Sequence, residues 1–321
     1  MKSEDISWRL GETVIDATVA APDEPGRYPG VVLVAGSGPT DRNWESPLLP
    51  GANGSGRLIA EQLASSGYVT MRYDKRASGP RAQQNVAILS GTISLESHFD
   101  ELNSAVSQLL ARPDVDGGRL FVLTSSEGAI HALHYQAHRG VVPFSGMVLT
   151  GAPGRALNEV ANSQVVSQLK GLDEGDELVS RYHDLVRRFE DGLPFSQDPA
   201  LPEFANNLVA ALSAPVNQPF TREFWSFTPA EHLRKTTVPV LVVIGKKDIQ
   251  CDWMLDGGAL EEAAQGTNNV TFYYPDNANH ALKYEPRPRE ELTGADALAY
   301  NTAGTHLDSE TIGTILGWLR E

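Results

Sequence analysis

The stretch "FVLTSSEGAIHAL" (Phe121 to Leu133) ends an apolar run, turns through two serines and a glycine, and begins a helical pattern. A strand that turns sharply into a helix can lift a serine above the edge of a sheet, where its hydroxyl is exposed for nucleophilic attack. Such an elbow requires small residues two positions before and two positions after the serine, because neighbouring backbone approaches closely there. The stretch therefore predicts a strand, a tight turn and a helix, with a serine at the turn.

The two serines of this turn differ in their neighbours. Ser125 has bulky residues at both of the positions in question, whereas Ser126 has Thr124 before it and Gly128 after it. Ser126 is therefore the candidate nucleophile, and Thr124 is a departure from the expected glycine that could strain or shift the elbow. The alternative is a serine that only caps the following helix, which is a common use of this residue.

The sequence on both sides of the turn alternates between apolar runs and helical patterns. Short apolar runs typical of strands in a parallel sheet occur in "GVVLVAG", "YVTMRYD", "GMVLTG", "VPVLVVIG" and "NVTFYY". Helical spacing occurs between them, and residues 6–22 alternate loosely around Gly11 as a β-hairpin would. The pattern predicts an α/β fold: a mostly parallel central sheet flanked by helices, with an N-terminal β-hairpin.

The alternation of strands and helices breaks between Pro153 and about Thr237. Three amphipathic helical patterns follow one another there with no strand between them. We expect a core domain of residues 1–152 and 237–321 and a helical cap (lid) insertion of residues 153–236, laid over the carboxyl edge of the strands. The alternative is a larger helical layer without a role at any site.

An aromatic cluster, "PFTREFWSF", lies near the end of this insertion. Its aromatic residues are Phe220, Phe224, Trp225 and Phe227. They are candidates for the wall of a substrate pocket, and the alternative is that they pack the insertion onto the rest of the protein.

A serine hydroxyl attacks only when a histidine removes its proton and a carboxylate orients that histidine. In a sheet with a serine elbow, the acid and then the histidine should follow in loops after later strands. Asp248 comes directly after "VPVLVVIG", and His280 follows "NVTFYY". If each is considered alone, Asp248 could be an ordinary turn aspartate and His280 an ordinary polar loop residue. Their order and placement together, however, predict a Ser126–His280–Asp248 triad. Asp252 and Asp256 are fallback acids.

The same mechanism needs two N–H donors for the oxyanion. The amide after the nucleophile, that of Glu127, is one candidate. The second should come from the "GSGPTDRNW" loop after the first core strand, where Gly38 or Ser37 can supply it and Pro39 cannot. We interpret Asp74, Lys75 and Arg76 of "YDKRASG" as ion-paired loop anchors beneath the site.

Composition excludes several classes of function. The chain has 321 residues, a net charge of −15 and one cysteine, Cys251. The acidic balance argues against nucleic-acid and anionic-membrane partners, and the single cysteine excludes an internal disulfide. With no signal-like or membrane-spanning segment, we expect a cytoplasmic protein, monomeric or homodimeric, that acts on a small-molecule substrate without a metal or cofactor.

The segments "GSGPTDRNW", "YDKRASG", "SSEGA", "VLVVIGKKDIQ" and "NANHALK" occur in an order that resembles the serine esterases of the α/β-hydrolase superfamily. Among these, the chain is similar to bacterial esterases with an SGPTDR loop, a YDKRG turn and a GHSEG elbow. The resemblance extends from about Gly30 to Leu319. It implies Ser126 as nucleophile with Asp248 and His280, and it implies the α/β-hydrolase fold. The sequence departs from it in the TSSEG elbow and at Ala77.

The function we expect is a carboxylesterase for short- to medium-chain esters that works through an acyl-enzyme. The alternatives left open are an acyltransferase, a thioesterase and a non-catalytic ligand-binding homologue. A nicotinamide-binding dehydrogenase is disfavoured, because the "VVLVAGSG" run lacks the third glycine of a dinucleotide-binding turn and no helix begins directly after it.

Overall fold

The computed structural model describes residues 1–138 and 140–321. Within this part of the chain, eight strands form one sheet in the order β1-β2-β4-β3-β5-β6-β7-β8. The strands are β1 (Lys2–Leu10), β2 (Thr13–Ala21), β3 (Tyr28–Val34), β4 (Val69–Tyr73), β5 (Val115–Ser125), β6 (Gly146–Thr150), β7 (Val240–Val243) and β8 (Val270–Tyr273). The pairs β1–β2 and β2–β4 are antiparallel, and the remaining pairs are parallel. The predicted mostly parallel sheet and N-terminal hairpin are confirmed.

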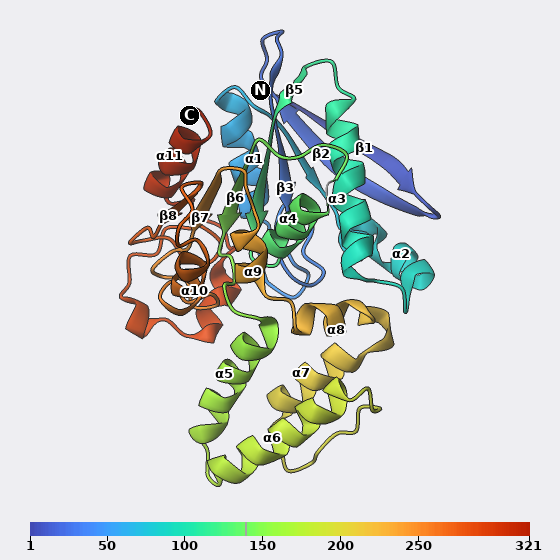
Figure 1. The fold of residues 1–321 in the computed structure, drawn as a ribbon, viewed down its shortest axis with the longest axis vertical. Coiled ribbons are helices and arrows are strands. Elements are labelled where there is room, and N and C mark those ends of the chain that lie inside the picture. Colours follow the sequence, from blue (N-terminus) through green and yellow to red (C-terminus); the bar gives the residue numbers. More distant parts are fainter. Residues whose placement is uncertain (139) are drawn as a thin grey trace. The chain divides into compact units, whose positions relative to one another are not determined.

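Helices cover both faces of the sheet (Figure 1). One face packs against α3 (Leu95–Leu110), α4 (Gly128–Ala137), α9 (Pro229–Arg234) and α10 (Leu255–Ala263). The other face packs against α1 (Ser55–Ser65) and α11 (Ser309–Trp318). A further helix, α2 (Ala82–Leu89), follows a short 3₁₀ turn after β4.

The apolar runs are continuous because successive side chains of a strand point to opposite faces, and both faces are covered. In β3, Val32 and Val34 belong to the core beneath α3 and α4, whereas Val31 and Leu33 belong to the core beneath α1 and α11. All four side chains are fully buried. Strands of this kind expose only their ends, so the loops at the carboxyl edge are where functional side chains can gather.

The described chain divides into two compact units: a sheet unit of Met1–Ile88, His98–Gly154 and Pro229–Glu321, and a helical unit of Leu89–Ser97 and Arg155–Thr228. The helical unit contains α5 (Leu157–Lys170), α6 (Gly175–Glu190), α7 (Glu203–Ser213) and α8 (Phe220–Trp225). It has a hydrophobic core of its own. In this division α9 belongs to the sheet unit, although the sequence places it inside the expected insertion. The assignment of the insertion as a cap stays a prediction.

The four aromatic residues of the "PFTREFWSF" segment lie in the helical unit. Phe224, Trp225 and Phe227 are buried. The Trp225 indole packs edge-on against Phe189, with ring centres 5.6 Å apart, and the Phe220 ring stacks on that of Phe224 at 5.3 Å. At least Trp225 therefore stabilises the interior of this unit, since it belongs to its core.

Among the described residues, no helix is both long enough and apolar enough to cross a membrane.

Candidate active site

The serine turn has the geometry of an elbow. Strand β5 ends at Ser125 and α4 begins at Gly128, so two residues turn the chain from strand to helix. Ser126 has a φ of 52°, a left-handed conformation that non-glycine residues seldom adopt. Its N–H donates to the Thr150 carbonyl of β6 at 2.8 Å, which holds the strained residue at the end of the sheet. Backbone strain of this kind occurs preferentially at functional sites.

Two glycines make room for this turn. A Cβ on Gly128 would lie 2.6 Å from the Val34 carbonyl oxygen, a distance that no side chain tolerates. A Cβ on Gly36 would lie 3.4 Å from that of Ser126 and 3.2 Å from the Ser125 carbonyl oxygen. A small residue was predicted two positions after the serine. Gly128 is required there because the backbone of β3 comes too close for any side chain.

Thr124 takes the place of the other expected glycine without disturbing the elbow. It is a regular residue of β5, paired with Val34 on one side and Leu149 on the other, and it is completely buried. Its hydroxyl lies 3.4 Å from the Val148 carbonyl oxygen. The branched side chain fits because this position is strand rather than turn, so the expected strain at Thr124 is absent and the unusual conformation is at Ser126.

The predicted acid and base are joined directly. His280 Nδ1 lies 2.7 Å from Asp248 Oδ2, and both side chains are buried, Asp248 completely. The other carboxylate oxygen of Asp248 accepts N–H bonds from Gln250 at 2.7 Å and from Cys251 at 2.9 Å. The carboxylate is thus fixed by backbone donors, and an N–H at Nδ1 of His280 leaves Nε2 available as a proton acceptor.

The histidine loop is shaped by its neighbours. The Asn279 side chain accepts N–H bonds from Ala281 and Lys283, both at 3.0 Å, which closes a tight turn around His280. A Cβ on Gly151, which follows β6, would lie only 3.0 Å from His280 Nδ1. The imidazole therefore occupies space that a glycine leaves open at the edge of the sheet.

Ser126 and His280 line the same pocket of about 300 Å³, formed entirely by the sheet unit. Apolar and aromatic side chains of Trp44, Leu48 and Tyr300 form part of its wall. Asp248 does not line the pocket. It is completely buried and is hydrogen-bonded to the His280 imidazole. The structure therefore brings the predicted base and nucleophile to one cavity and the predicted acid to the base.

The fallback acids are engaged elsewhere. Asp252 accepts N–H bonds from Met254 and Leu255 and an ion pair from Arg289 at 2.9 Å. Asp256 accepts the N–H of Asp252 at 2.9 Å. These bonds assign both residues to the architecture of the loop before α10, and Asp248 remains the candidate acid.

Amide donors suitable for an oxyanion are present beside Ser126. In the part of the chain that the structure describes, the N–H groups of Glu127, Ser37 and Gly38 donate to no protein acceptor. Ser37 lines the pocket, whereas Gly38 lies outside the lining with a φ of 67° that favours glycine. Of the two alternatives in the loop, Ser37 is therefore placed at the cavity and Gly38 provides the turn.

A buried lysine links the two sides of this oxyanion region. Lys75 Nζ donates to the Gly36 carbonyl, in the loop that contains Ser37, and lies 3.2 Å from Glu127 Oε1. Lys75 and Glu127 are each only 4–5% exposed. Burial would raise the pKa of the Glu127 carboxyl, but the Lys75 charge and the His131 hydrogen bond hold it well below its usual range. The interpretation of Lys75 as a loop anchor is confirmed, and its contact with the residue after the nucleophile was not predictable from spacing.

The charge network continues beneath the elbow. His131 Nε2 lies 3.1 Å from Glu127 Oε1, and the His98 ring lies 4.5 Å from that of His131. His98 Nδ1 is 2.8 Å from Glu101, which also pairs with Arg76 at 2.8 Å. Burial and the neighbouring His98 lower the pKa of His131 to about 4, so its ring is neutral near pH 7. Asp74 likewise pairs with Arg42, 3.2 Å away.

Three side chains at this site could ligate a metal. Asp248, Cys251 and His280 have ligand atoms within 4.8 Å of one another, and no other such group occurs among the described residues. Two of the three already share the 2.7 Å hydrogen bond of the acid and base. That bond occupies the imidazole and the carboxylate with each other, at the pocket that Ser126 and His280 line.

Comparison with known proteins shows the family of the chain. A model of the alpha/beta hydrolase family matches residues 31–295. Esterase EstD of Thermotoga maritima is 27% identical over 306 residues, which are 94% of this chain and 64% of that protein. The chain thus spans less than two thirds of the length of this relative.

Solved structures share the fold. An esterase of Pyrococcus furiosus aligns with a TM-score of 0.58 at 15% identity, covering 99% of this chain and 90% of the other. Proline iminopeptidase of Mycobacterium smegmatis aligns with a TM-score of 0.56 at 12% identity, covering 99% and 98%. One of these proteins is an esterase and the other a peptidase, so the fold is compatible with more than one substrate class.

Proposed function

The chain belongs to the alpha/beta hydrolase family, and from this premise we propose that it is a serine carboxylesterase for short- to medium-chain esters. One observation carries the proposal. Ser126, held at a φ of 52° at the end of β5, lines the same pocket as His280, whose Nδ1 is bonded to the buried carboxylate of Asp248. The likeness to an esterase over 94% of the chain supports the same substrate class.

In the first half-reaction, Ser126 Oγ attacks the ester carbonyl while His280 Nε2 takes its proton. The bond between Oγ and the carbonyl carbon forms, and the carbonyl oxygen becomes an oxyanion that accepts from the amides of Glu127 and Ser37. Asp248 stabilises the imidazolium that results. When the intermediate collapses, the carbon–alkoxy bond breaks and His280 returns the proton to the departing alcohol.

Water repeats the sequence on the acyl-enzyme. His280 removes a proton from the water, whose oxygen attacks the acyl carbon, and the same amides hold the second oxyanion. Collapse releases the carboxylic acid and returns the proton to Ser126. His280 carries every proton transfer in this scheme, and the backbone amides stabilise both oxyanions without giving up a proton.

The size of the pocket supports the preference for shorter chains. A volume of about 300 Å³ is at the lower limit of ordinary ligand cavities. Leu48 is largely exposed and Trp44 is buried in the wall, so one side of the pocket is apolar and open to solvent. We expect 4-nitrophenyl acetate and butyrate to be hydrolysed faster than the palmitate, and a clear long-chain preference would contradict this part of the proposal.

The decisive experiment is labelling with a fluorophosphonate, followed by mass-spectrometric identification of the modified peptide. We expect one label on Ser126, none in Ser126→Ala, and a fall in 4-nitrophenyl butyrate turnover of at least about 10⁴-fold in that variant. Ser125→Ala is the matched control, because Ser125 lines the same pocket and should leave the label in place. An unlabelled wild-type protein, folded by circular dichroism, would indicate a ligand-binding homologue instead.

A further inference from the structure

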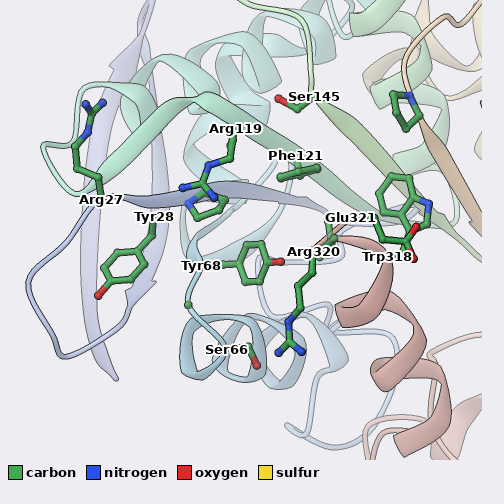
Figure 2. A pocket seen from close by; sticks show the side chains of 14 residues that line it. Arg27, Tyr28, Ser66, Tyr68, Arg119, Phe121, Ser145, Trp318, Arg320 and Glu321 are labelled. Carbon is green, nitrogen blue, oxygen red and sulfur yellow. The ribbon is translucent and has the colours of Figure 1, made fainter.

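A second and larger cavity, of about 780 Å³, lies in the sheet unit at the opposite edge of the sheet (Figure 2). Its lining includes Tyr28 and Pro29 at the start of β3, Ser145 just before β6 and Pro239 just before β7. On β5, Phe121 lines this cavity, and Ser126 lies five residues further along. Five residues of extended strand span about 16 Å, so the two cavities are separate sites.

The walls of this cavity are aromatic. Tyr28, Tyr68, Phe121 and Trp318 all line it. Trp318 and Phe121 meet over Gly146, where a Cβ would lie 2.9 Å from the indole and 3.2 Å from the phenyl ring. The glycine therefore allows the two rings to close together as one apolar surface, suited to a flat aromatic body.

The rim of the cavity is cationic, in a protein with a net charge of −15. Arg27, Arg119 and Arg320 line it, against the single side-chain carboxylate of Glu321. Arg27 donates to the Val115 carbonyl at 3.2 Å, and Arg119 pairs with Asp116 at 2.8 Å. Arg320 is exposed, and its side chain has no ion pair among residues 1–138 and 140–321. A guanidinium group in this position is free to bind a carboxylate in a bidentate way.

Tyr68 provides the second polar feature. Its side chain is 4% exposed, and within the described part of the chain its hydroxyl has no hydrogen-bond partner. In Figure 2 its ring lies between the side chains of Arg119 and Arg320. Burial raises the pKa of this hydroxyl, and the charges of Arg320 and Arg119 act in the opposite direction. The hydroxyl itself is reached by solvent at the cavity, so it is available as a hydrogen-bond donor to a ligand.

We propose that this cavity binds an aromatic carboxylate: the flat body lies against Phe121 and Trp318, and the carboxylate accepts from Arg320 and the Tyr68 hydroxyl. Arg320 and the Tyr68 hydroxyl would orient the ligand, and the apolar wall would contribute most of the affinity. Small-molecule sites commonly combine a few polar groups with an apolar lining in this way. Because no group of the Ser126 pocket takes part, the proposal stands apart from the proposed esterase activity.

The test uses 2-naphthoate and its neutral analogue 2-naphthamide as probes, with the full chain and isothermal titration calorimetry. We expect saturable binding of naphthoate and much weaker binding of the amide, because the guanidinium requires a negative charge. Arg320→Met should raise Kd about tenfold or more, and Tyr68→Phe should raise it several-fold. Arg9→Met is the matched control: Arg9 is an exposed arginine of β1 that does not line the cavity, and its removal changes the net charge equally.

Circular dichroism and thermal melting establish that each variant is folded. Tyr68→Phe keeps the ring and removes only the hydroxyl, so it remains informative if Arg320→Met proves unstable. Absence of naphthoate binding to the wild-type protein overturns the proposal. If Arg9→Met weakens naphthoate binding as much as Arg320→Met does, the effect of charge is non-specific and the proposal is overturned. An unchanged Kd in both Arg320→Met and Tyr68→Phe also overturns it.

Discussion

Two positions along β5 show how differently one strand can be used. At its carboxyl end, Ser126 lines a pocket of about 300 Å³ next to a buried, hydrogen-bonded acid and base. In the middle of the strand, Phe121 lines a cavity of about 780 Å³ whose charged groups are three exposed arginines and the exposed Glu321. The smaller cavity is the one where backbone strain, buried charge pairs and unsatisfied amides coincide. Cavity volume therefore indicates room for a ligand, whereas fixed and desolvated polar groups indicate chemistry.

The largest expected effect tests the carboxyl end. Asp248→Asn should lower kcat for 4-nitrophenyl butyrate by about 10⁴-fold, because an amide no longer selects the useful histidine tautomer or stabilises its charge. Fluorophosphonate labelling should slow in parallel. Asp252→Asn is the control, since its carboxylate binds Arg289 and backbone amides instead of His280. Equal losses in both variants would mean that the acid has been misassigned.

The next effect tests the lysine that joins the oxyanion loop to the elbow. Lys75→Met alone would leave the Glu127 charge buried and unpaired, so the informative variant combines Lys75→Met with Glu127→Gln. The double variant should fold, yet lose about 10²-fold in kcat with little change in KM, because the Gly36 carbonyl loses its donor and the Ser37 amide loses its position. Glu127→Gln alone is the control. If the double variant is folded and fully active, Lys75 has only a structural role.

The charged network beneath the elbow should make stability depend on pH. The pKa of His131 is lowered to about 4 by burial and by His98, so below its usual value near 6.5 the unfolded chain binds a proton that the folded chain does not. Stability is therefore lost as the pH falls from 6.5 towards 4, on the order of 2 kcal/mol for this group. Urea unfolding between these pH values measures it.

His131→Gln is the variant that isolates this contribution, because it removes the titrating group and keeps a polar side chain near Glu127. The slope of stability against pH should become smaller without vanishing. A residual slope is expected because burial and the charge of His138 also lower the pKa of His134 to about 4. An unchanged slope would show that His131 is not the source.

The smallest expected effect concerns Thr124, which takes the place of the glycine expected in a serine elbow. Thr124→Gly should leave kcat for 4-nitrophenyl butyrate nearly unchanged and lower the free energy of unfolding by about 1 kcal/mol, because a glycine in a strand loses more conformational entropy. The buried threonine also loses its packing against β6. A large gain in rate would instead mean that Thr124 distorts Ser126 after all.

Several local features were not visible in the sequence. Helices α2, α8, α9 and α10 were not predicted, because they are short and contain glycine, proline or several polar residues. The pairing of Lys75 with Glu127 joins residues 52 positions apart, and no periodicity reports such a contact. The aromatic and cationic cavity at the amino edge draws on six separate segments, none of which has a motif.

The sequence by itself predicted the alternation of strands and helices, the elbow with its obligatory Gly128, and the candidates for the serine, the acid and the histidine. These follow from local rules: burial fixes periodicity, and close backbone approach fixes small residues. Only the tertiary structure decided that Asp248, and not Asp252 or Asp256, bonds to His280, and that Ser37 rather than Gly38 lines the pocket. Those choices depend on how loops from distant strands meet, and the free-energy differences that set them arise from contacts that exist only in the folded chain.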